Sequence, residues 1–293
     1  MPKRPVALTA GALLGMSALF ATAVPAAADA QESFKGAPTP VAHRGASGYA
    51  PENTLAAVDK AAALGIRWVE NDVQRTRDGK LVVIHDTTLD RTTDAEEVYP
   101  DRAPWNVGDF TAAEIAKLDA GSWFGKKYAG TKVPTLKQYL ARVGKHDRKL
   151  LLELKEPGRY PGIEAQTLKE LSNEGWLDAD HVDGKLIVQS FDAGAVANVH
   201  LLKPAVKTGF LGKPDVDDLG TYALFTDQIN PSSSTLTKDY VDAVHAVRGA
   251  HGKPMQVLTW TVNDAKGARA AAKAGVDGII SNFPDVVRDA LED

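Results

Sequence analysis

The feature that most constrains the fold is a regular alternation of short apolar strands and helices from residue 136 to the end of the chain. Such alternation indicates parallel β/α units. Eight parallel strands close a TIM barrel, whose usual size is about 250 residues. A doubly wound open sheet is the structural alternative, but no G-x-G-x-x-G follows a strand, which argues against its dinucleotide-binding form. The sequence therefore predicts an α/β fold, a (β/α)8 barrel, with strands that begin at Val41, Ile66, Lys149, Leu186, Lys207, Asp227, Gln256 and Gly278.

A hairpin and a long excursion are expected after the second barrel strand. Arg77 to Lys80 is a turn signal, and the apolar run Leu81 to Ile84 follows it. A parallel return needs a crossover of a dozen or more residues, so an antiparallel pair is expected, which carries His85 back towards Asp72. Residues 87–134 lack sustained periodicity and are expected to form a loop excursion packed over one end of the molecule. Helices are expected at residues 51–65, 136–143, 162–174, 193–202, 238–250 and 265–274, near 215–219, and from Pro284.

The first thirty residues have the pattern of a secretory signal peptide. Lys3 and Arg4 precede an apolar run, and an A-x-A cleavage site ends at Ala30. We therefore expect cleavage near Ala30 and a secreted protein, extracellular or periplasmic, with a retained membrane anchor as the alternative. No later apolar run is long enough to span a bilayer, so no stable membrane insertion is expected. The predicted organisation is a signal peptide at 1–30, a flexible segment at 31–40 and a single barrel domain at 41–293.

Composition excludes several classes of function. Lys and Arg number 34 against 38 Asp and Glu, a net charge of -4, and no basic stripe is visible. Nucleic acid is therefore not an expected partner. The chain has no cysteine, which excludes disulfides, thiolate metal sites and cysteine nucleophiles. Any metal must be held by oxygen or imidazole.

Three acidic side chains fall at the carboxyl ends of predicted barrel strands, where barrel active sites lie. Side chains alternate along a strand, so Glu70 and Asp72 share a face. Together with Glu153 they would repel one another in one barrel mouth unless a cation lay between them. Oxygen ligands alone indicate one hard divalent ion, Mg²⁺ or Ca²⁺. The alternative is three separate salt bridges, to Arg67, Arg75 and Lys155.

Two histidines are candidates for proton transfer near neutral pH. His43 and His85 each follow a strand and precede a turn, and the predicted hairpin brings their regions together. Arg44 can hold phosphate oxygens in a bidentate fork and Lys155 as a point charge, although both could instead balance the carboxylates. The other histidines are interpreted as structural or surface residues, namely His146, His181, His200, His245 and His251.

These residues lie in a series of segments that occur in order between about Val41 and Asp285: HRGASGYAPENTLAA, VENDVQRTRDG, LVVIHDTTLDRTTD, LDAGSWFG, LLELK, QSFD, LTWTVND and GVDGIISNFPD. The series resembles the glycerophosphodiester phosphodiesterase family. The resemblance implies a TIM barrel of the phospholipase-C-like phosphodiesterase group. It also implies cleavage of glycerophosphodiesters to glycerol 3-phosphate and an alcohol, so the expected partner is a small-molecule substrate.

The resemblance also assigns roles to residues. It implies His43 and His85 as catalytic residues, Arg44 as the phosphate-binding arginine, and a divalent cation held by Glu70, Asp72 and Glu153. Lys155 matches the lysine two residues past the last ligand, and Trp260 matches an aromatic residue that lines the substrate pocket. Asn71 departs from the family, which often has a hydrophobic residue between the first two ligands, but position 71 should face away from the mouth.

Our mechanistic hypothesis takes His43 as base and His85 as acid. The nucleophile is either water or the neighbouring glycerol hydroxyl, which would give a cyclic phosphate. The leaving alcohol and the choice between Ca²⁺ and Mg²⁺ stay open. Three other functions are considered: a phospholipase-D-like or phosphatidylinositol-type lyase on intact lipids, a non-catalytic exported phosphate-ligand binding protein, and a sugar-active barrel hydrolase with paired carboxylates. The last leaves both histidines and Arg44 unexplained.

Overall fold

The computed structural model describes residues 36–292. The predicted signal peptide and residues 31–35 of the predicted flexible segment lie outside the described residues. Thr39 and Pro40, which were also assigned to that segment, instead begin strand β1 (Thr39–Ala42) and pair with β9 (Gly278–Ser281). Among the described residues, no helix combines the length and the apolar character that are needed to cross a membrane.

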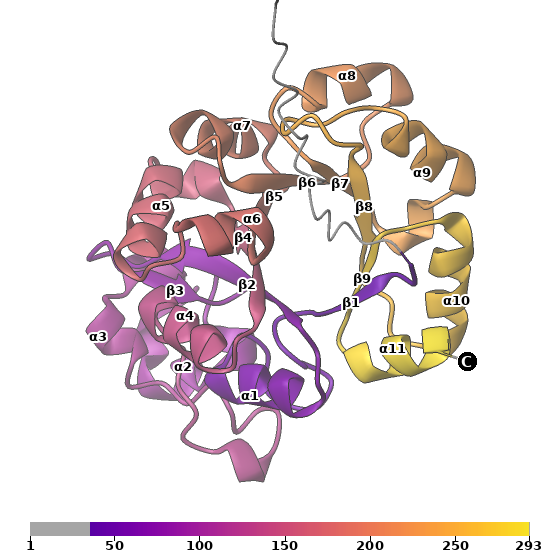
Figure 1. The fold of residues 1–293 in the computed structure, drawn as a ribbon. Helices are drawn as coiled ribbons and strands as arrows, with labels where there is room; N and C mark the ends of the chain where they lie inside the picture. The colour runs from indigo at the N-terminus through magenta and orange to yellow at the C-terminus, as the bar shows by residue number, and fades with distance from the viewer. Residues whose placement is uncertain (1–35, 293) are drawn as a thin grey trace, which may run out of the picture. The chain divides into compact units, whose positions relative to one another are not determined.

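Within residues 36–292, eight parallel strands form a closed barrel (Figure 1). Neighbouring strands follow the order β1-β9-β8-β7-β6-β5-β4-β2, and β1 also pairs with β2, which closes the ring. This closure excludes an open doubly wound sheet and confirms the predicted (β/α)8 barrel. The remaining barrel strands are β2 (Trp68–Arg75), β4 (Lys149–Leu154), β5 (Leu186–Ser190), β6 (Lys207–Leu211), β7 (Gln228–Asn230) and β8 (Gln256–Thr259).

Helices surround the barrel (Figure 1). In α4 the buried residues Leu136, Tyr139, Leu140 and Val143 recur at helical spacing and face the core. Thr135 begins this helix, and its hydroxyl and the Gln138 side chain form a capping box. The helices of the barrel are α1 (Leu55–Ala63), α4 (Leu136–Lys145), α5 (Ile163–Asn173), α6 (Ala179–Gly184), α7 (Ala193–Leu202), α8 (Leu219–Tyr222), α9 (Lys238–His245), α10 (Ala265–Ala274) and α11 (Pro284–Glu292).

The start of α1 and the end of α9 differ from the prediction by more than one helical turn. Helix α1 begins at Leu55 rather than Pro51, because Thr54 caps it and Asn53 adopts a positive φ of 58°. Helix α9 ends at His245 rather than Ala250, because the chain reverses in a turn in which the Gly249 amide donates to the Lys253 carbonyl at 2.8 Å. Helix α6 was not predicted.

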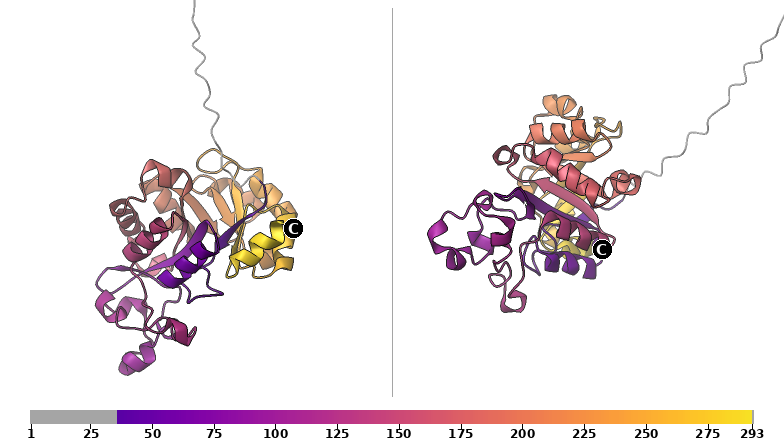
Figure 2. Two further views of the ribbon diagram at one scale, coloured as in Figure 1. Left: turned by 60° about the horizontal axis from the view of Figure 1, so that its bottom comes forward. Right: turned by 90° about the vertical axis from the view of Figure 1, so that its left-hand side faces the viewer.

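The hairpin and the excursion lie where the sequence placed them. Strand β3 (Leu81–Val83) runs antiparallel to β2, as predicted. Residues 87–134 form a lobe that projects to one side of the barrel (Figure 2). The lobe contains α2 (Ala95–Val98) and α3 (Ala112–Ile115), and its Phe110 and Leu118 share a small core with Val82 and Ile84, so it is more ordered than a loop excursion. It meets the loop after β1 where the Tyr128 hydroxyl donates to the Tyr49 carbonyl at 2.7 Å.

The barrel interior changes character along its axis. One level holds an apolar cluster that includes Trp68 on β2 and Leu151 on β4. Two residues further along the same strands, on the same face, lie Glu70 and Glu153. The alternate residues of both strands pack outwards against the helices, as Val69 and Leu152 do. The acidic side chains thus lie towards the carboxyl end of the barrel, where barrel active sites form.

Candidate active site

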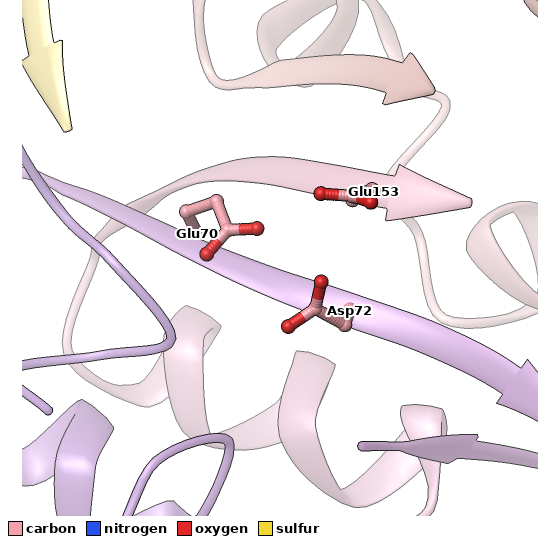
Figure 3. Close-up of side chains that lie close together, drawn as sticks. All are labelled: Glu70, Asp72 and Glu153. Atoms are coloured by element: carbon pink, nitrogen blue, oxygen red, sulfur yellow. The ribbon is translucent and has the colours of Figure 1, made fainter. Parts of the chain in front are cut away.

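Three buried carboxylates converge at the mouth of the barrel. Glu70 and Asp72 come from β2 and Glu153 from β4, and the strand register places Asp72 beside Glu153. One oxygen from each carboxylate lies within 4.8 Å of the others, and Figure 3 shows Glu70 and Asp72 on one strand and Glu153 on its neighbour, with the three carboxylates close together. A hard cation binds oxygens at about 2.0–2.6 Å, so two of its ligands are at most about 4–5 Å apart. The donor set therefore fits a divalent cation such as Ca²⁺ or Mg²⁺.

The electrostatics of the cluster also favour a cation. Burial, followed by the charges of Asp72 and Glu153, raises the pKa of Glu70 well above its usual value. Burial and the charge of Asp72 raise the pKa of Glu153 to about 8. Burial acts in the same direction on Asp72, but Arg44, His85 and Lys155 outweigh it and lower the pKa of Asp72. Nearby basic groups thus compensate the negative charge of Asp72 but not the charges of all three carboxylates.

The turn between β1 and α1 holds two of the carboxylates in place. The Arg44 amide donates to Glu70 Oε2 at 2.8 Å. The Asn53 side chain donates to Asp72 Oδ2 at 2.7 Å and accepts from the Asp72 amide at 3.2 Å. Both Arg44 and Asn53 have a positive φ, which costs free energy in residues other than glycine. The bonds to the acids offset this cost, so the turn is built around the cluster.

His43 directly follows β1, and Asn282, which directly follows β9, holds its ring. The Asn282 side-chain oxygen lies 2.6 Å from His43 Nδ1 and accepts a second hydrogen bond from Ser47 at 3.0 Å. Since an amide oxygen only accepts, Nδ1 carries the proton and Nε2 is free to take another. Burial, followed by the charge of Arg44, lowers the pKa of His43 to about 4. The imidazole is therefore neutral at neutral pH.

His85 lies at the end of an ion-pair network. Its Nδ1 is 2.6 Å from Asp86 Oδ1, so Nε2 is the atom left to exchange a proton. Arg91 donates to both Asp86 and Glu52, and Glu52 in turn accepts from Arg44 at 2.8 Å. Partial burial alone would raise the pKa of Asp86, but hydrogen bonds from Arg91 and His85 lower it to about 2. The carboxylate that orients His85 therefore stays ionised.

Two cationic side chains flank the acidic cluster. Arg44 Nε lies 3.4 Å from Asp72 Oδ2. Lys155 Nζ donates to Glu153 Oε1 at 2.9 Å and lies 3.9 Å from Asp72 Oδ1. Of the salt bridges considered as an alternative, the one to Lys155 is present, whereas Arg75 donates to the Pro161 carbonyl. Arg44 and Lys155 are mostly buried but keep some exposed surface at the mouth, where they can contact a bound anion.

An aromatic wall lies beside Lys155. Trp260, which follows β8, donates through Nε1 to the Asn230 carbonyl at 2.8 Å. Its ring packs edge-on against Phe191, with centroids 5.5 Å apart, and Lys155 Nζ lies 5.3 Å from the centroid of the Phe191 ring. Phe191 is 49% exposed. The two rings give the mouth an apolar side next to Lys155.

The site contains residues that were not singled out from the sequence, namely Glu52, Asn53, Arg91, Phe191 and Asn282. Phe191 and Asn282 directly follow β5 and β9, so the rule that located His43 could also have located them. Asn71 faces away from the mouth, as expected, and is fully buried. Within the part of the chain that the structure describes, its amide has no hydrogen-bond partner.

Four of the five other histidines pair with aspartates away from the cluster. The pairs are His146 with Asp59, His181 with Asp178, His245 with Asp277 and His251 with Asp227.

The fold and these side chains define a (β/α)8-barrel enzyme whose mouth holds two histidines beside three buried carboxylates. The model of the Glycerophosphoryl diester phosphodiesterase family matches residues 43–286, and the chain belongs to this family. It is 33% identical over 290 residues to a glycerophosphodiester phosphodiesterase of Bacillus subtilis, covering 93% of each chain. It is 35% identical over 249 residues to one of Caldanaerobacter subterraneus, covering 84% of this chain and 95% of the other.

A solved structure extends this similarity to the fold. The phosphodiesterase of Oleispira antarctica, determined in complex with the product sn-glycerol-3-phosphate, superimposes with a TM-score of 0.76 at 30% identity. The match covers 88% of this chain and 98% of that one.

Proposed function

We propose that this chain, a glycerophosphodiester phosphodiesterase, hydrolyses glycerophosphodiesters to sn-glycerol 3-phosphate and an alcohol at the barrel mouth. One divalent cation, Ca²⁺ or Mg²⁺, would be held by Glu70, Asp72 and Glu153. The observation that carries the proposal is the convergence of these acids within 4.8 Å in a mouth that also presents two histidines. The product bound to the Oleispira antarctica enzyme supports the substrate class.

The phosphate of the substrate is bound from two sides. A bound divalent cation would neutralise charge on the phosphate oxygens as a Lewis acid. Arg44 would donate to the remaining oxygens through its fork, and Lys155 would act as a point charge. Both side chains already lie against the acidic cluster, so a phosphate beside the cluster would be within their reach.

The two histidines divide the proton transfers. His43 is neutral at neutral pH with Nε2 free, so it is suited to take a proton from the nucleophile. His85 would donate a proton from Nε2 to the departing alkoxide, since Asp86 occupies its Nδ1. Phosphorus NMR of the reaction would reveal a cyclic phosphate if the glycerol hydroxyl, rather than water, attacks first.

Trp260 and Phe191 would form the apolar side of the substrate pocket. The Phe191 ring lies next to Lys155 and packs against Trp260, so a substrate whose phosphate contacts Lys155 would place a carbon chain against these rings. This arrangement suits a small diester with one charged and one apolar part.

Glycerophosphocholine is the test substrate. Turnover to glycerol 3-phosphate and choline is expected with added Ca²⁺ or Mg²⁺, and intact phosphatidylcholine vesicles are expected to be cleaved at least about a hundredfold more slowly. The loops at residues 87–95 and 227–237 are mostly polar, so they offer little apolar surface for contact with a membrane. Enzymatic measurement of both products checks this, and preferential cleavage of the intact lipid would establish the lipid-directed alternative instead.

We further propose that the protein is exported. The prediction of a signal peptide cleaved near Ala30 rests on the sequence alone, because those residues lie outside the described part. Mass spectrometry of the culture medium of the expressing cells is expected to find a chain that begins at Gln31. A full-length chain that stays in the membrane fraction would contradict it.

A further inference from the structure

We infer that Gln74 and Tyr160 are positioning residues that hold His85 in place for proton donation. The inference rests on the proposed function, in which His85 is the acid. Gln74 lies on β2 two residues beyond Asp72 and on the same strand face, but no role in the acidic cluster or in phosphate binding requires it.

The Gln74 amide binds the backbone on which His85 lies. Gln74 is fully buried, and its Nε2 donates to three consecutive carbonyls, those of Ile84 and His85 at 3.0 Å each and that of Asp86 at 2.6 Å. The amide has only two hydrogens, so it is shared among the three acceptors. Strand β3 ends at Val83, which means that these carbonyls come just after the last ladder position. The side-chain amide therefore takes the place of a neighbouring strand.

Tyr160 fixes which way the Gln74 amide points. Its hydroxyl donates to Gln74 Oε1 at 2.9 Å, and the ring is 6% exposed. Because the oxygen is occupied by a donor, the nitrogen must face the carbonyls. The Ile84 amide donates to the Asp72 carbonyl at 3.0 Å. Both the amide and the carbonyl of Ile84 are therefore bonded to β2. The backbone of His85 is thus held at a fixed distance from the acidic cluster by two buried side chains, whose hydrogen bonds go to the backbone and to each other.

The consequence is specific to proton donation. A displaced His85 would fail to protonate a poor leaving group such as choline, whereas nitrophenolate departs without a proton. Gln74→Met keeps the chain length and removes the donor. It is expected to lower kcat about 10- to 100-fold for glycerophosphocholine, part of the about 10²–10⁴ that acid catalysis supplies. For the p-nitrophenyl diester of glycerol 3-phosphate the loss is expected to be under about threefold.

Tyr160→Phe is the milder variant and keeps the test decisive if Gln74→Met does not fold. It removes one hydrogen bond, so kcat for glycerophosphocholine is expected to fall about threefold to tenfold, with the nitrophenyl diester unchanged. Tyr240→Phe is the matched control, since Tyr240 is also buried and its hydroxyl donates to the Pro214 carbonyl at 2.9 Å, away from His85. It should change neither substrate. The cation concentration for half-maximal activity should be the same in all three variants.

His85→Ala separates failure of this inference from failure of the proposed function. If His85→Ala slows both substrates equally, the acid role of His85 is wrong. If His85→Ala is selective for glycerophosphocholine while Tyr160→Phe and any folded Gln74→Met slow both substrates equally or neither, Gln74 and Tyr160 do not position His85.

Discussion

Removal of divalent cations is expected to lower kcat/KM for glycerophosphocholine at least about a thousandfold. Charge stabilisation by a bound cation is worth several kcal/mol, and each 1.4 kcal/mol is a factor of ten in rate. Without a cation, Glu70 and Glu153 would also repel the phosphate that Arg44 and Lys155 attract. The measurement is turnover after treatment with a chelator, followed by titration with Ca²⁺ and with Mg²⁺. Full turnover in the chelated enzyme would contradict the assignment of the acidic cluster.

Two variants are expected to weaken the cation site to different degrees. Glu153→Gln removes one charged ligand and is expected to lose most activity at any cation concentration. Asn53→Gly removes the side chain that holds Asp72 but tolerates the positive φ at that position. Outer-shell partners of metal ligands typically contribute about 10–100-fold in affinity, so Asn53→Gly should need that much more cation and still reach high activity. Asp59→Asn, which alters the pair with His146 away from the site, is the control.

The pH dependence of cation binding follows from the raised pKa of Glu153, about 8. Protons compete with the cation, so its affinity should fall as pH falls below about 8. A carboxylate whose pKa is raised on folding contributes stability that is fully present below its unfolded pKa, near 4.5, and is lost as pH rises towards 8. The chelated protein should therefore lose Tm over this range. At about 100 times Kd the cation adds about 2.7 kcal/mol, which raises Tm by several degrees.

The sequence predicts the barrel because its evidence is local and repeated. Each strand is a short apolar run, and each helix has its own spacing and cap, so strands such as Lys149–Leu154 and Leu186–Ser190 have the predicted bounds. The same kind of local evidence, acidic residues at the ends of apolar strands, predicted that Glu70, Asp72 and Glu153 lie together. Strand alternation fixes the face, and barrel closure fixes the neighbour.

The parts that sequence patterns missed depend on contacts between distant segments. The helix expected from Pro51 begins later, because Asn53 is drawn into a bond with Asp72 and Glu52 into ion pairs with Arg44 and Arg91. Asn282 holds His43 across 239 positions of sequence. The place of Asn282 directly after β9 makes it a candidate, but nothing local in either segment shows that the side chain would bond to His43. The helices within residues 87–134 were not predicted, because they are too short to show a helical period in the sequence.

Replacement of His43 by alanine is expected to lower kcat about 10²–10⁴-fold, the usual contribution of a general base. The loss should be similar for glycerophosphocholine and the p-nitrophenyl diester, because activation of the nucleophile precedes departure of either leaving group. This equality distinguishes His43 from His85, whose loss should affect only the substrate that needs a proton. His181→Gln, on α6, is the control and should leave turnover unchanged. Selectivity for the leaving group in His43→Ala would mean that the two roles are reversed.

The Asn282 contact gives the base a further signature. The pKa of His43, about 4, is lowered by burial and by Arg44, so the neutral base persists to acidic pH. Asn282→Asp places a carboxylate 2.6 Å from Nδ1, if the geometry is kept, and an anion beside an imidazole favours its charged form. The pKa of His43 should rise, so the acidic limb of kcat/KM should move to higher pH. Measurement with saturating cation separates this limb from proton competition at the acidic cluster. An unchanged limb in a folded Asn282→Asp variant would show that a group other than His43 supplies the base.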